Sequence, residues 1–141
     1  MTLEQMCCSL EPSIKLKELG VPQNSVFYWT DEDIILMPGY DKWKITNAKG
    51  LYQPAKYISA FTSGELGEML PYAIKKQDIL YFLEQSKRTS GHNYDSPIAF
   101  IEVAYVSISA GAIALPIQEK TEADARAAML IYLLKNKLIN L

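Results

Sequence analysis

The feature that most constrains the fold is a series of short β-rich runs separated by polar turns. Short polar connections are typical of hairpins, in which strands are antiparallel, whereas parallel strands would need a crossover between each pair. One central helix is available, so the sequence predicts an α+β fold: an antiparallel sheet of about five or six strands with two or three helices packed mainly on one face. The runs are Ser25–Thr30, Ile34–Met37, Trp43–Thr46, Tyr57–Phe61, Ile79–Gln85 and Ile98–Val106, and the polar connections include 31–33 and Ser86–Pro97.

The first helical segment lies near the N-terminus, where apolar residues recur at helical spacing from Leu3 to Leu19. Pro12 interrupts this pattern. A fresh helix capped by Ser9 would place Pro12 in its first turn, where the missing N–H group does no harm. Gly20 is the expected end of that helix.

The middle helical segment begins with a capping box, in which Thr62 is followed by Glu65 three residues later. Its apolar stripe continues to Ile74. Pro71 removes a helical hydrogen bond, so we expect a break or kink there. Gly67 indicates either a place where another element approaches this helix closely or relief of the crowding caused by Pro71.

The last segment has the strongest helical pattern. Thr121 is the expected cap, and an apolar stripe runs from Ala123 to Leu138. Glu122 and Arg126 are four residues apart with the acid first, the better orientation for an exposed ion pair.

Length and charge bound the class of protein. The chain has 141 residues, with 14 basic and 16 acidic side chains and a formal net charge of −2. This length suits one domain, residues 1–141. A mildly acidic chain does not favour the basic face of a general nucleic-acid binder, so a nucleic-acid partner is not expected.

Residues Ile98–Ile117 have the length of a membrane span, with Glu102 as their one charged residue. A carboxylate near the middle would be costly in lipid, and the β-branched and aromatic bias favours one or two buried strands. The N-terminus shows no export signal, and the adjacent Cys7 and Cys8 do not suit a disulfide framework. We therefore expect a cytoplasmic protein without membrane contact.

Reactive side chains are few. His92 is the only histidine, and a hydrolase or transferase site would have to join it with groups such as Asp95 and Arg126. Cys7 lies on an apolar stripe, so we interpret it and Cys8 as core thiols rather than nucleophiles. The usual ligand spacings of zinc sites are missing, and we predict no metal, no cofactor and no catalytic residue.

Aromatic residues are the clearest candidates for a binding surface. Tyr40, Trp43, Tyr52 and Tyr57 cluster in a stretch that also contains glycines, prolines and lysines. Aromatic side chains carry interface energy, and mixtures of lysine and aromatic residues stack on bases. Two interpretations stay open: these residues form a binding surface, or they cover the open face of the sheet.

Three blocks stand out in the sequence: LKELGVPQ at 16–23, ISAFTSGELGEMLP at 58–71 and EADARAAMLIYLL at 122–134. Together, in this order, they resemble a family of small uncharacterised proteins encoded by phages, prophages and gut-bacterial genomes. The resemblance implies a soluble, single-domain protein carried by a mobile element. It implies no activity, cofactor or catalytic residue.

These observations predict a non-enzymatic binding or accessory protein of phage type that acts through protein–protein contacts, with a second copy of itself as one partner. Because the predicted helices cover mainly one face of the sheet, apolar residues such as Tyr28 remain on the other face. Residues 40–57 or a second copy of the chain would cover them. Two alternatives stay open: a small hydrolase or transferase, and a single-stranded nucleic-acid binder that uses the 40–57 aromatics and lysines.

Overall fold

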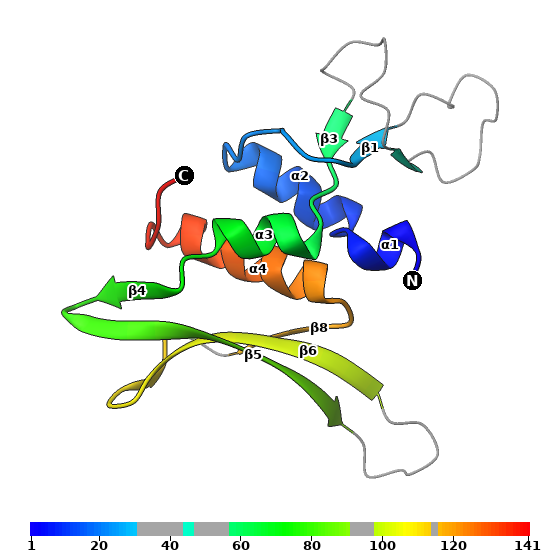
Figure 1. Cartoon of the computed structure of the whole chain (residues 1–141). Helices are drawn as coiled ribbons and strands as arrows, with labels where there is room; N and C mark the ends of the chain where they lie inside the picture. The colour runs from blue at the N-terminus through cyan, green and yellow to red at the C-terminus, as the bar shows by residue number, and fades with distance from the viewer. Residues whose placement is uncertain (31–43, 47–56, 91–97, 114–115) are drawn as a thin grey trace, which may run out of the picture.

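The computed structural model describes residues 1–30, 44–46, 57–90, 98–113 and 116–141. Groups of strands are separated by helices along the chain, and α3 and α4 lie over one sheet (Figure 1). This arrangement confirms the predicted α+β class. The elements in chain order are α1 (Leu3–Met6), α2 (Leu10–Glu18), β1 (Tyr28–Thr30), β2 (Lys44–Thr46), β3 (Tyr57–Ser59), α3 (Ser63–Met69), β4 (Ala73–Lys76), β5 (Ile79–Ser90), β6 (Ile98–Ser107), β7 (Gly111–Ala112), β8 (Ile117–Glu119) and α4 (Glu122–Lys135).

The described strands are antiparallel, as predicted, and they form two sheets. The smaller sheet has the order β2-β1-β3, and the larger has the order β4-β5-β6-β7 with β8 also pairing β6. The predicted run Ile34–Met37 lies outside the described residues. The segment weighed as a membrane span supplies β6, β7 and the start of β8. Within the described ranges, no helix has the length and apolar character to cross a membrane.

The N-terminal segment divides where the sequence predicts it to. Ser9 is the N-cap of α2, and Pro12 lies in its first turn. The Ser9 backbone N–H and hydroxyl both donate to the Asp124 carboxylate of α4, at 2.6 and 2.7 Å. A long-range contact thus joins the start of α2 to the first turn of α4. Gly20 follows the helix with φ +84°, a conformation that favours glycine.

The middle segment is helical for less of its length than predicted. The capping box is present, with the Thr62 hydroxyl accepting from the Glu65 N–H at 3.2 Å. The helix ends at Met69, just before Pro71, and Ala73–Lys76 form strand β4 instead of continuing the apolar helical stripe. Gln77 and Asp78, with φ of 50° and 63°, then make a tight hairpin turn into β5.

Strand β5 is longer than the sequence predicts, because it continues past Gln85 to Ser90. The polar residues from Ser86 onward pair with β6 in an unbroken antiparallel register, Ser86 opposite Glu102 and Ser90 opposite Ile98. Pairing with an apolar neighbour strand satisfies the backbone groups of every second residue and holds the segment extended, although its side chains carry no β signal.

The core lies between the five-stranded sheet and the helices. α4 contacts α2, α3, β6 and β8, so it is buried on more than the stripe the sequence predicts. Ala125, Met129 and Leu133 are buried beside the expected Ala127 and Leu130. The sheet contributes its helix-facing residues, which include Tyr81, Val103 and Tyr105.

Candidate interaction surface

The structure places one of the four predicted surface aromatics. Tyr57 lies in β3 and is 5% exposed, and its ring packs edge-on against Tyr28 with the centroids 6.0 Å apart. Tyr28 is buried as well, so it does not form the open apolar face that the sequence suggests. Tyr40, Trp43 and Tyr52 lie outside the described residues.

Cys7 and Cys8 are free thiols, and both are fully buried, as predicted. Burial, and to a smaller extent the neighbouring Cys8, raise the pKa of Cys7 to about 12. Burial likewise raises the pKa of Cys8 to about 11, although its Sγ lies 3.0 Å from the Ser13 hydroxyl oxygen. Thiols that stay protonated at neutral pH are poor nucleophiles.

Arg126, one of the three residues of the predicted hydrolase constellation, is already engaged. Its Nη2 lies 2.6 Å from the Glu122 carboxylate, as the sequence spacing predicts, and its Nε donates to the Gln85 side chain at 2.9 Å. Nη1 donates to the Ser63 carbonyl of α3. A Cβ on Gly67 would lie 2.6 Å from Nη1, which confirms the predicted close approach. His92 and Asp95 are not among the described residues.

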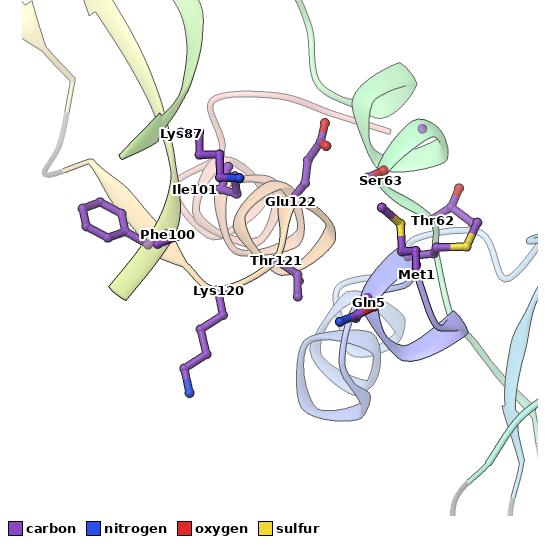
Figure 2. A pocket seen from close by; sticks show the side chains of 13 residues that line it. Met1, Gln5, Thr62, Ser63, Lys87, Phe100, Ile101, Lys120, Thr121 and Glu122 are labelled. Atoms are coloured by element: carbon purple, nitrogen blue, oxygen red, sulfur yellow. The ribbon is translucent and has the colours of Figure 1, made fainter. Parts of the chain in front are cut away.

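A groove of about 820 Å³ lies at the N-terminal end of α4, where the sheet, α1 and the start of α3 converge (Figure 2). Its wall is mainly apolar, with Lys87 and Lys120 as cations and hydroxyls from Thr62 and Thr121. Glu122, its one carboxylate, is paired with Arg126, so the lining has a net positive charge. This chemistry suits the binding of apolar and anionic groups. Within the described ranges, no three metal-binding side chains form a cluster.

The face of the five-stranded sheet away from α3 and α4 is a second surface, which we call the outer face (Figure 1). Strand alternation places Leu80, Phe82 and Val106 on it, because Tyr81, Val103 and Tyr105 face the core. Leu80 is 49% exposed. Tyr72, 77% exposed, contacts Phe82 edge-on with ring centroids 5.7 Å apart.

Charged residues continue the outer face along β5 and β6. Arg88 Nε lies 3.1 Å from Glu102 Oε1, and the second oxygen of Glu102 accepts from Gln118 of β8 at 3.0 Å. Glu84 is exposed on the same face. Glu84 lies in a run that the sequence predicts as a strand, but nothing in the pattern assigns it to a surface with Arg88, which falls in the predicted polar connection Ser86–Pro97.

Comparisons with protein-family models, with curated proteins and with solved structures found no match.

Proposed function

We propose that the chain is a non-catalytic binding protein that acts through protein–protein contacts and pairs first with a second copy of itself. The observation that carries this proposal is the outer face of the five-stranded sheet, where Leu80 and Phe82 lie on the side opposite to the core residue Tyr81 and the exposed Tyr72 ring contacts Phe82. Contiguous apolar surface of this kind commonly marks an interface, because a partner removes it from water.

Two features of the described residues support binding over catalysis. The Cys7 and Cys8 thiols are buried with raised pKa values, and the Glu122 carboxylate of the groove is neutralised by Arg126. Neither arrangement is that of a nucleophile or a general base. The accessory role in a phage or mobile element, which the resemblance implies, stays a prediction.

The experiment is sedimentation velocity with light scattering on the wild-type chain, from about 1 to about 200 μM, because self-association depends on concentration. We expect the mass to rise from 15.9 kDa towards twice that value. A mass of 15.9 kDa at every concentration would overturn the proposal.

A further inference from the structure

Strand β5 has an unpaired edge along its second half. β4 pairs with Ile79–Phe82, and the Leu83 N–H donates to the Tyr72 carbonyl at 2.9 Å. Beyond Leu83, the one described neighbour of β5 is β6. Figure 1 shows β5 continuing beyond β4. An open edge of this kind presents backbone groups to which another strand can add.

Alternation along the strand decides which backbone groups face this edge. The Leu83 N–H points to the β4 side, so the N–H and C=O groups of Gln85 and Lys87 point to that side as well. Those of Ser86, which lies between them, face β6. Residues 84–88 are all exposed. Gln85 and Lys87 therefore each offer a backbone donor and a backbone acceptor to an added strand.

The groove at the N-terminal end of α4 lies beside the same stretch of β5. Lys87 belongs to the lining of this groove, and it shares the helix-facing side of the sheet with Ile101, its partner in β6. Figure 2 shows Lys87 and Lys120 on opposite sides of the first turn of α4. β5 and β8 likewise lie on opposite sides of β6. Lys87 is therefore the cation of the groove that stands next to the open edge.

The positive charge of this groove is left uncompensated by the described residues. Glu122, the one carboxylate of the lining, contacts Arg126 at 2.6 Å and accepts from the Gln85 side chain at 3.1 Å. Lys87 and Lys120 have no ion pair within the described ranges. A positive groove on a chain with a formal net charge of −2 selects an acidic partner by charge complementarity.

We infer that an extended, acidic segment of another protein adds to this edge as an antiparallel strand beside residues 84–90. The added residue opposite Lys87 then exchanges both backbone hydrogen bonds with it, and the two side chains lie on the same side of the sheet. An acidic residue at that place forms an ion pair with Lys87 across the strands, which stabilises the pairing. The inference rests on the proposed binding role, and it uses the edge of the sheet instead of the outer face.

β4 fixes where the added strand stops. The Tyr72 carbonyl already accepts from Leu83, so the added segment must end or turn away beside Glu84. A second copy of β5 is too long for this space, because antiparallel pairing centred on Ser86 would run its last residues into Tyr72. Pairing centred on Lys87 would set two ammonium groups opposite each other. The occupant is therefore a different chain.

The test uses synthetic peptides in fluorescence anisotropy titrations at physiological salt. The probe alternates valine with glutamate over the length of the open edge, because valine favours strands, and a peptide with lysine in place of glutamate is its matched control. The wild-type chain should bind the acidic peptide at least about tenfold more tightly than the basic one. Lys87→Glu should weaken binding of the acidic peptide about five- to thirtyfold and tighten binding of the basic peptide. Circular dichroism checks that each variant is folded.

Lys120→Glu is the control for charge alone, because it makes the same change of charge in the same groove on the side away from β5. Salt screens a charge at that distance from the added strand, so the acidic peptide should lose less than about threefold in affinity. Equal losses from Lys87→Glu and Lys120→Glu would show that the general field of the groove holds the peptide, and would overturn the pairing beside β5.

N-methylation of the peptide tests the backbone contact without altering the protein. Methyl groups on the glutamate nitrogens remove the N–H groups that face β5 and should abolish binding. Methyl groups on the valine nitrogens, which face away from β5, should leave binding unchanged. In the complex with the acidic peptide, the Gln85 and Lys87 amides should exchange with solvent more slowly than in the free chain.

Two results would overturn the added strand: no binding of the acidic peptide up to about 1 mM, or equal binding of the two N-methylated peptides. Self-association of the chain is measured without peptide, so either result leaves the proposed function standing. A chain that stays monomeric and yet binds the acidic peptide overturns only the proposed self-association.

Discussion

Replacing Glu65 by alanine tests the contact that joins the start of α3 to the chain before β1. One carboxylate oxygen accepts from the Thr62 N–H at 2.7 Å, the Thr62 hydroxyl at 2.9 Å and the Ser25 hydroxyl at 3.0 Å. The other accepts from the Val26 N–H at 3.1 Å. The substitution keeps the bond from the residue-65 N–H to the Thr62 hydroxyl, but it removes the carboxylate half of the capping box and both links to residues 25–26.

The magnitude follows from these bonds. A hydrogen bond to a charged group contributes about 1.5–3 kcal/mol when it is shielded from water, and the Ser25 residue that donates to this carboxylate is buried. Val26 is 61% exposed, so water replaces the acceptor of its N–H at little cost. We expect Glu65→Ala to lower the free energy of unfolding by about 2–3 kcal/mol, and Glu65→Gln, which keeps one acceptor oxygen, by about half as much.

The assay is urea unfolding followed by circular dichroism, with stability taken from the linear dependence on denaturant. The matched control is Glu68→Ala, the same substitution at an exposed position of the same helix, which should change stability by less than about 0.5 kcal/mol. If the free energies of unfolding of the Glu65→Ala and Glu68→Ala variants differ by less than about 0.5 kcal/mol, the Glu65 carboxylate does not stabilise the fold as described.

Three further predictions concern the core, the thiols and the contact between α3 and α4. Leu130→Ala, at a fully buried position of α4, should cost about 2–5 kcal/mol in the same assay, and a loss below about 1 kcal/mol would contradict the packing described. The pKa values of Cys7 and Cys8 are raised from 9.0 to about 12 and 11, so the native thiols hold protons that the unfolded chain releases. The stabilisation that these protons give should therefore be fully present below pH 9 and be lost as the pH rises towards 11. Urea midpoints measured across this range should fall more steeply in the wild-type protein than in a Cys7→Ala/Cys8→Ala variant. In the wild-type chain, Gly67→Ala should give little gain or a loss in the free energy of unfolding, because the new Cβ meets the Arg126 guanidinium. In an Arg126→Met background the same substitution should raise the free energy of unfolding by about 0.5–1 kcal/mol. Equal effects in both backgrounds would show that residues 67 and 126 are not coupled.

The candidate site was only partly predictable from the sequence. The ion pair of Glu122 with Arg126 is predicted from their helical spacing, and it is present. The close approach at Gly67 is predicted from the absence of a side chain there, and it is present as well. Glu84 lies near the end of a predicted strand and Arg88 in a polar stretch, and they share a face only because β6 holds residues 84–88 extended. The sequence suggests Tyr28 and Tyr57 as exposed aromatic residues. The pairing of β1 with β3 instead brings the two rings together in the interior.

The sequence by itself determined the features whose causes lie within a few residues: the caps at Thr62 and Thr121, the start of α2 after Ser9, the helix end before Pro71 and the antiparallel hairpins. These signals are local, since a cap, a proline or a short polar turn acts on the backbone of its immediate neighbours. The tertiary structure alone decided the division into two sheets, the strand identity of Ala73–Lys76 and the length of β5. Those outcomes depend on which distant strand satisfies the backbone of a segment, and no pattern inside the segment encodes its partner.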